Sequence, residues 1–348
     1  MSVLKGFAIS IVVLFVTLVA VESAFRVFDV YRPPDYPPRP PREMFVADSQ
    51  VGYHLWPSTQ TCIRYPPGSH RVQALISNSD GFASSRELGS PDTRPRVLVL
   101  GDSFTFGIGV EEGERYTEVV EDLEPSWRVD NMGMTGWGTD LMVRTLETFG
   151  PKAQPDVVVL AVYTDDFRRV DKLFAGVGFA YPKYALVNDS LVDVPYPRSW
   201  FVRKLHLANL VREVVRKVKG RNHYALNEAL VGRFDELTRR LGATPVIIFL
   251  PGLGDTEEGQ TRRRNLRTWA EQRGIVFGDF TDPLQSVGVE ETYLEENWHW
   301  NAYGHRIAGE ALHALLREVL PPPPPTVTAV ETPPWRVPRV RFCKDDGV

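Results

Sequence analysis

Three uninterrupted apolar runs, separated by segments with helical spacing, constrain the fold of this chain more than any other feature. The runs are RVLVL at residues 96–100, DVVVLAVY at 156–163 and TPVIIFL at 244–250. A strand with one solvent-exposed face alternates apolar and polar residues, whereas an uninterrupted apolar run is typical of a parallel strand covered on both faces. Such strands in alternation with helices predict an α/β fold, in which helices cover both faces of one parallel sheet.

The segments around these runs complete the alternation of strands and helices. Short strands are predicted at 127–131 and 275–277, and helices at 112–123, 139–149, 203–241, 262–273 and 301–319. In a sheet of this kind, ligands bind beyond the carboxyl ends of the strands. Residues 101–105 follow the first apolar run at that edge, so a functional site is expected there.

The composition fits a folded, mildly acidic protein and argues against a nucleic-acid binder. The 348 residues are 43% hydrophobic and 24% charged, with a formal net charge of −4. Nucleic-acid binding would need a basic surface, and the one basic run, at residues 262–264, is interpreted as the solvated face of a helix. Cys62 and Cys343 are too few for a disulfide scaffold, and no spacing suggests zinc. We expect two unpaired thiols; one bridge between them is the alternative if the chain is exported.

The N-terminal segment predicts a membrane anchor or a signal peptide. Residues 7–21 are apolar apart from one serine and one threonine. They would span about 22 Å of a hydrocarbon core of about 30 Å, and residues 6 and 23–25 would nearly close that gap. A signal peptide fits the length better, but the cleavage site would be a poor one. Lys5, on the short N-terminal side, favours an N-terminus in the cytoplasm and a body outside it.

Two proline-rich segments bracket the globular body. RPPDYPPRPPRE at 32–43 is expected to be an extended spacer. The predicted organisation is an anchor or signal segment (1–25), a linker (26–43), an N-terminal extension packing on the domain (44–94), an α/β domain (95–320) with a helical insertion (203–241), and a proline-rich tail (321–348).

The block GDSFT at 101–105 places Ser103 directly after the first buried strand. A serine hydroxyl needs a base to become a nucleophile. If a helix starts here, the Ser103 backbone N–H can also point at a developing oxyanion. The alternative is structural, with Asp102 or Ser103 capping the turn. The pentapeptide alone does not decide between the two.

Two further blocks follow later strands. NMGMTGWGTD at 131–140 carries three glycines, which permit tight turns and a close approach of backbone N–H groups to a ligand. The alternative is an ordinary glycine loop before a helix. VYTDDF at 162–167 ends a buried strand on Asp165 and Asp166, which either reach a pocket or form a solvated acidic turn.

The last block, ENWHWNAYGHRIAGEAL at 296–312, contains His299 just before the final predicted helix. Glu296, three residues earlier, is placed to accept the proton on one imidazole nitrogen and leave the other to act as a base. His305, within the helix, is interpreted as structural. Four tryptophans are expected in the core or a pocket wall: Trp127, Trp137, Trp298 and Trp300.

Together, the order serine, glycine, Asx and histidine resembles the SGNH (GDSL-like) hydrolase family over about residues 95–320. The resemblance implies a flavodoxin-like three-layer α/β/α sandwich with a parallel sheet, here preceded by an N-terminal hydrophobic helix. It implies Ser103 as the acyl nucleophile, His299 as the base and Glu296 as the acid that orients the base. The HWN triplet at 299–301 is similar to the anchored or exported subgroup that includes polysaccharide acetyl-modifying proteins.

The family's oxyanion hole combines the serine N–H, a glycine and an asparagine side chain. Gly136 is the best match to the glycine and Gly133 the second. Asp102, Gly136 and Asp165 are the residues that we assign to oxyanion or substrate binding.

Two positions depart from the family's pattern. The family's asparagine falls on Asp165, whose ionised carboxylate only accepts hydrogen bonds and would repel an oxyanion. Either Asp165 is protonated, which needs a strongly raised pKa, or the hole relies on two backbone donors alone. Glu296 stands where the family usually has Asp, with Glu295 and Asp282 as fallback candidates.

We therefore expect a membrane-anchored serine esterase that acts on acyl esters, with no metal and no organic cofactor implied. The domain would lie outside the cytoplasm, or be secreted if the N-terminal segment is cleaved. Expected partners are a small-molecule or O-acylated glycan substrate and the membrane, but no nucleic acid. Trp137 and Trp298 lie nearest the motifs and could stack on a sugar, but core packing is the interpretation that we favour for both. The alternatives are an O-acyltransferase with the same site and a non-catalytic SGNH-fold binding protein, which Asp165 would favour.

Overall fold

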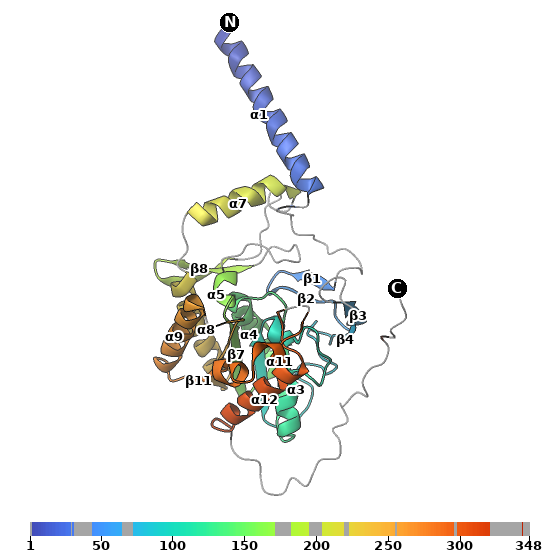
Figure 1. The fold of residues 1–348 in the computed structure, drawn as a ribbon. Coiled ribbons are helices and arrows are strands. Elements are labelled where there is room, and N and C mark those ends of the chain that lie inside the picture. Colours follow the sequence, from blue (N-terminus) through green and yellow to red (C-terminus); the bar gives the residue numbers. More distant parts are fainter. Residues whose placement is uncertain are drawn as a thin grey trace.

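The structure, a computed structural model, describes residues 2–28, 30, 44–64, 72–170, 182–194, 204–218, 223–254, 256–295, 298–320 and 343. The predicted spacer at 32–43 lies outside these residues, and so does the predicted tail at 321–348 apart from Cys343. The elements run in the order α1 (Ser2–Val27), β1 (Phe45–Asp48), β2 (Gly52–Leu55), β3 (Gln60–Arg64), β4 (Val72–Ile76), β5 (Arg96–Gly101), α2 (Ser103–Phe106), α3 (Tyr116–Leu123), β6 (Arg128–Gly133), α4 (Thr139–Ala153), β7 (Val157–Tyr163), α5 (Asp166–Arg169), β8 (Lys183–Val187), β9 (Ser190–Val194), α7 (His206–Val218), α8 (His223–Arg240), β10 (Thr244–Leu250), α9 (Glu257–Glu271), β11 (Val276–Asp279), α10 (Thr281–Gln285), α11 (Val289–Thr292) and α12 (Ala302–Leu316) (Figure 1).

The central sheet has five parallel strands in the order β11-β10-β7-β5-β6. Numbered along the chain within this sheet, the order is that of a flavodoxin-like fold. The direction of winding reverses between β5 and β7, and a crevice opens beyond the carboxyl ends of strands at such a point. The predicted parallel sheet is confirmed, and the topology places the ends of β5 and β7 at the expected ligand site.

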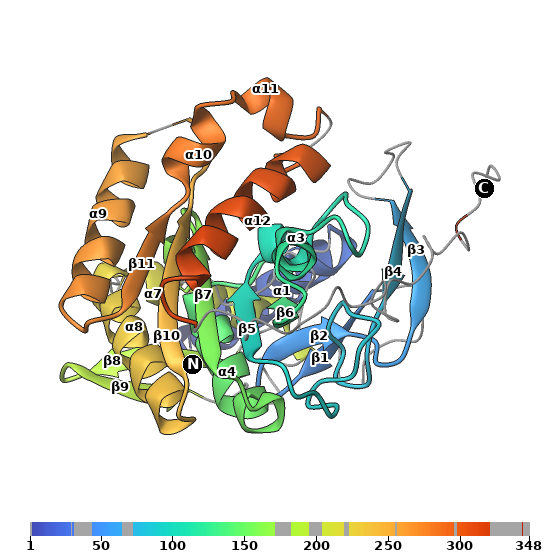
Figure 2. The same cartoon turned by 90° about the horizontal axis from the view of Figure 1, so that it is seen from below.

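Helices cover both faces of this sheet, which explains why its strands are apolar throughout. Leu98 and Leu100 of β5 belong to one buried cluster, with residues of α4 and α8. Val97 and Val99 belong to a second cluster, with residues of α3 and α12. Figure 2 shows these helix pairs on opposite sides of the sheet. Alternate side chains of one strand therefore enter two different cores.

The N-terminal extension consists of two antiparallel hairpins, β1–β2 and β3–β4, and shares the first of these cores. Tyr53 of β2 is buried and lies edge-on to Trp137, as does Phe82. These short strands had no distinct sequence pattern, because their burial depends on packing against the loop after β6.

The structure divides the predicted helical insertion at 203–241 into two helices with different roles. α8 packs on α4 and β10 and forms part of the crossover between β7 and β10. Parallel neighbours need such a crossover helix, so α8 is a core element of the sandwich and not an insertion. α7 instead contacts α1, away from the sheet (Figure 1).

Within the described residues, α1 is the one helix long and apolar enough to cross a membrane, over Lys5–Val27. None of that stretch is buried inside the protein. A membrane anchor and a signal sequence share these properties.

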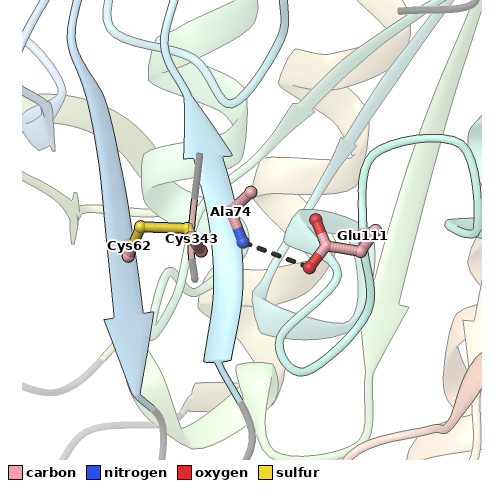
Figure 3. Close-up of a disulfide and its surroundings, with 4 residues drawn as sticks. All are labelled: Cys62, Ala74, Glu111 and Cys343. Atoms are coloured by element: carbon pink, nitrogen blue, oxygen red, sulfur yellow. Dashed lines mark hydrogen bonds between the residues drawn. A yellow bond between two sulfur atoms is a disulfide. The ribbon is translucent and has the colours of Figure 1, made fainter. Parts of the chain in front are cut away.

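The expectation of two unpaired thiols is wrong, because Cys62 and Cys343 form a disulfide (Figure 3). The two Cα atoms lie 5.8 Å apart although 281 positions separate them in the chain. Cys62 is on β3, and the neighbouring strand β4 is tied to the domain by a 3.1 Å hydrogen bond from the backbone N–H of Ala74 to Glu111. The sequence showed no such proximity, because it arises only when the end of the chain returns beside β3.

Candidate active site

Ser103 occupies the turn between β5 and α2, at the carboxyl edge of the sheet. Asp102 is the N-cap of α2, and its carboxylate accepts a 3.0 Å hydrogen bond from the backbone N–H of Phe104. Gly107 ends the helix after one turn in the left-handed region, at φ 82°. The structural interpretation of this block is confirmed, because Asp102 caps the turn. The interpretation of Ser103 as a nucleophile stays a prediction.

His299 lies near the C-terminal end of the domain sequence, and its side chain contacts Ser103 directly. The distance from its Nε2 to Ser103 Oγ is 2.8 Å. Its loop is held by a 2.9 Å hydrogen bond from the backbone N–H of Leu294 to the carbonyl of His299. Asn301 caps α12 by accepting from two backbone N–H groups. The structure thus brings together two residues that are 196 positions apart in the chain.

The surroundings of His299 keep its imidazole neutral. Burial lowers the pKa of His299, Asp102 partly offsets this, and the positive charge of Arg169 lowers it further, to about 4. The ring of Phe104 lies 5.0 Å from the imidazole, measured between centroids. A neutral imidazole at neutral pH has a free electron pair on one nitrogen and can accept a proton from Ser103.

The acid that would orient His299 remains a prediction. Glu296 lies outside the described residues. Of the fallback candidates, Glu295 is exposed at the edge of that gap, and Asp282 is exposed on α10.

A cavity of about 520 Å³ opens beside Ser103 and His299. Asp165 lines it, so three of the predicted site residues share one pocket. Three arginines contribute to the same wall: Arg168, Arg169 and Arg262.

The hypothesis of a protonated Asp165 is wrong. Burial alone would raise the pKa of this carboxyl, but Arg168 donates to it at 2.6 Å and Arg262 lies 3.4 Å away. Together with Arg169, they hold the pKa of Asp165 below its usual value. Asp165 is therefore ionised and accepts hydrogen bonds only.

Arg169 links the first and third blocks, a contact that sequence reasoning missed. Its Nη1 donates to Asp102 at 2.7 Å, to Asp166 at 2.5 Å and to the carbonyl of Trp137 at 3.1 Å. Asp102 and Asp166 are both fully buried. Burial and the charge of Asp102 raise the pKa of Asp166 well above its usual value, and Arg169 only partly offsets them. Asp102 does not line the cavity; it contacts Arg169 and the backbone N–H of Phe104, next to Ser103.

The two candidate glycines serve different needs. Gly136 adopts φ +78°, in the left-handed region, and a Cβ there would lie 3.1 Å from the Tyr53 hydroxyl. A Cβ on Gly133 would lie 2.4 Å from the backbone nitrogen of Phe106, so this glycine allows β6 to approach α2. Neither glycine lines the cavity.

The N-terminal extension forms hydrogen bonds with the loops that follow β5 and β6. The hydroxyl of Tyr53 donates to the carbonyl of Thr135, next to Gly136. The amide of Gln73 donates to the carbonyl of Gly107 at 2.8 Å and accepts from the backbone N–H of Gly109 at 2.9 Å. Sequence reasoning missed both residues, since they lie outside every motif.

The tryptophans separate into three core residues and one exposed residue. Trp127, Trp137 and Trp300 are buried. Trp298 lines the cavity beside His299 with 74% of its surface exposed, so core packing was the wrong expectation for this residue. Among the described residues, no group of three or more His, Cys, Asp and Glu residues is placed to hold a metal ion.

Comparison with known proteins points to one family. A model of the GDSL-like lipase/acylhydrolase family matches residues 99–307. The fold is similar to that of solved structures that include TesA (14% identity, TM-score 0.45, covering 65% of this chain and 99% of that one) and the psychrotrophic esterase EstA from Pseudoalteromonas sp. (14%, 0.41, 64% and 97%). A lipase/acylhydrolase from Enterococcus faecalis is similar to the same degree (14%, 0.41, 66% and 99%). No curated protein matches the sequence.

Proposed function

Because the chain belongs to the GDSL-like lipase/acylhydrolase family, we propose that it is a serine esterase in which Ser103 is the nucleophile and His299 the base. The observation that carries this proposal is the 2.8 Å contact between Ser103 Oγ and His299 Nε2 at the wall of a cavity. The loss of turnover in Ser103→Ala tests it.

The reaction would proceed through an acyl-enzyme. Ser103 Oγ attacks the ester carbonyl carbon while its proton passes to His299 Nε2. Collapse of the tetrahedral intermediate breaks the bond to the alcohol oxygen, and His299 returns the proton to that alcohol. Water then attacks the acyl group with His299 as base, which releases the carboxylic acid and restores Ser103. Glu296 is the proposed orienting acid.

The oxyanion would be held mainly by backbone donors. Ser103 is the first residue of α2, so its N–H has no acceptor within the helix. We assign the second donor to the backbone N–H of Gly136 from the place of its block after β6, although this glycine does not line the cavity. The ionised Asp165 cannot donate, which supports a hole without the family's amide.

Activity should fall only at strongly acidic pH. Turnover needs neutral His299, whose pKa is about 4, so kcat/KM for an aryl acetate should rise as pH increases through about pH 4 and then stay level to neutral pH. The measurement is the acid limb of the pH profile. A midpoint near 6.5, the ordinary histidine value, would contradict a buried, neutral base.

Asp165→Asn should raise kcat. The substitution removes a negative charge from the cavity wall and adds an NH₂ donor, and one oxyanion donor is commonly worth about 10²-fold or more. Asp165→Ala is the matched control, because it removes the charge without adding a donor. Equal rates for the two variants would show that the amide makes no contact with the oxyanion, and a loss of rate in both would show that Asp165 contributes to catalysis.

We further propose that the substrate is an O-acylated glycan and that Trp298 forms its docking platform. An exposed indole beside the reacting groups offers a flat apolar face, and charged side chains around it can bind hydroxyl groups. Trp298→Ala should raise KM for an O-acetylated oligosaccharide about tenfold, a cost of about 1.4 kcal/mol, with kcat nearly unchanged. Trp298→Phe should retain most of the affinity. An equal rise of KM for a small aryl acetate would contradict a sugar platform.

The domain is proposed to lie outside the cytoplasm, held to the membrane by α1. The apolar span supports an anchor. The Cys62–Cys343 disulfide supports an oxidising compartment.

A further inference from the structure

The body of the protein is joined to the end of α1 by specific polar contacts. The carboxylate of Glu22 accepts hydrogen bonds from the backbone N–H groups of His206 at 3.2 Å and Leu207 at 2.9 Å, the first residues of α7. Arg26 donates to the same carboxylate at 2.9 Å and to the carbonyl of Lys204 at 2.8 Å. A carboxylate on α1 thus supplies acceptors that the start of α7 would otherwise lack.

α7 is a strongly amphipathic helix whose apolar face is largely uncovered. Val211, Val214 and Val215 follow the i, i+3, i+4 spacing of one helix face, and their exposed fractions are 54%, 48% and 45%. The sequence continues this stripe with Leu207 and Leu210. The positions between carry charged residues, namely Arg212, Glu213, Arg216 and Lys217.

The position of Glu22 relates this face to the end of the apolar stretch of α1. Glu22 is the first charged residue after the apolar stretch of α1, so it marks where a spanning helix would leave the hydrocarbon. The first residues of α7 contact Glu22, and Figure 1 shows α7 lying across the end of α1, between α1 and the globular body. An amphipathic helix at this depth fits the boundary between headgroups and acyl chains.

We propose that α7 is an interfacial helix, immersed through its valine face in the outer surface of the membrane that α1 spans. Two helices at a steep angle, one across the bilayer and one along its surface, would fix the height and orientation of the catalytic domain above the lipid. The inference rests on α1 being retained as an anchor. The contacts of Glu22 support that premise, because cleavage at residue 23 would remove the acceptor at the start of α7.

The test uses the full-length chain in vesicles of phosphatidylcholine and phosphatidylglycerol. Val214→Cys is labelled with an environment-sensitive fluorophore; the native cysteines are paired with each other and do not react. Val289→Cys on α11, a valine with 38% exposure, is the matched control. A lipid with a quencher near its headgroup should remove most of the fluorescence at position 214 and little at 289. Glu22→Ala should restore fluorescence at position 214, because α7 is no longer held at the membrane surface.

A third probe separates failure of this inference from failure of the anchor. Leu14→Cys, exposed in the middle of α1, should be quenched by a lipid that carries its quencher deep in the acyl chain. Quenching at 14 without quenching at 214 would keep the anchor and overturn the interfacial helix. A chain mass that lacks α1 would overturn both. Burial of the 214 probe in vesicles without lipid quenching would show that a protein covers the valine face, and would also overturn the proposal.

Discussion

Ser103→Ala is expected to lower kcat for a short-chain aryl acetate by about 10⁶-fold, the loss seen when the nucleophile or base of a serine hydrolase is removed. The substitution removes the hydroxyl that lies 2.8 Å from His299 Nε2, which is the group proposed for covalent attack. The fold should be unchanged, since the cap of α2 comes from Asp102. Initial rates of the purified protein, with thermal unfolding in parallel, provide the measurement.

Ser126→Ala is the matched control, because Ser126 lies before β6, at the opposite edge of the sheet. It should leave the rate unchanged. Retained turnover in Ser103→Ala would exclude Ser103 as the nucleophile. A folded wild type without Ser103-dependent turnover, together with an inactive Asp165→Asn, would favour an acyltransferase with a guarded acceptor site or a binding protein.

Arg169→Met is expected to lower the free energy of unfolding by about 3–5 kcal/mol, the cost of breaking a buried ion pair by removal of one partner. Asp102 and Asp166 are buried and share this one guanidinium in the contacts described above. The corresponding fall in Tm is on the order of 10 °C. Thermal unfolding at neutral pH measures it.

The pH dependence of this loss of stability, together with a second substitution, tests whether the buried carboxylates cause it. Asp166 has a raised pKa in the folded protein, so ionisation of its carboxyl lowers the free energy of unfolding. This loss of stability disappears as pH falls below the raised pKa and the carboxyl becomes protonated. The loss in Arg169→Met should therefore shrink at acidic pH, and Asp166→Asn should restore part of it at neutral pH. Arg168→Met is the control: this side chain is 55% exposed, and an exposed pair contributes about 1 kcal/mol or less. Equal losses for the two arginines would contradict the buried cluster.

The strands of the sheet could be predicted closely from the sequence. β10 has the predicted bounds, and β5 and β7 differ from theirs by one residue each. Both faces of these strands are buried, so nearly all of their residues carry the apolar signal. β1–β4 could not be predicted, because they are short and become buried only against the loops after β5 and β6. The crossover helix α8 was recognised as a helix but misjudged as an insertion, since its neighbours are not visible in the sequence.

Part of the candidate site was also predictable. Motif order and the position of each block relative to a strand brought Ser103 and His299 into one hypothesis, and the structure places them 2.8 Å apart. The exposure of Trp298 was not predictable, because its neighbour Trp300 is buried in the same short loop.

The sequence by itself determined the α/β architecture, the apolar N-terminal helix and the identity of the candidate nucleophile and base. Each of these is recognised from a short continuous segment, namely an apolar run or a motif. Tertiary structure alone decided the charge state of Asp165, the sharing of Arg169 by Asp102 and Asp166, and the pairing of Cys62 with Cys343. Ionisation depends on burial and on charges within a few ångströms, and a disulfide depends on the separation of two Cα atoms. Both are set by residues far apart in the chain, which only the folded protein brings together.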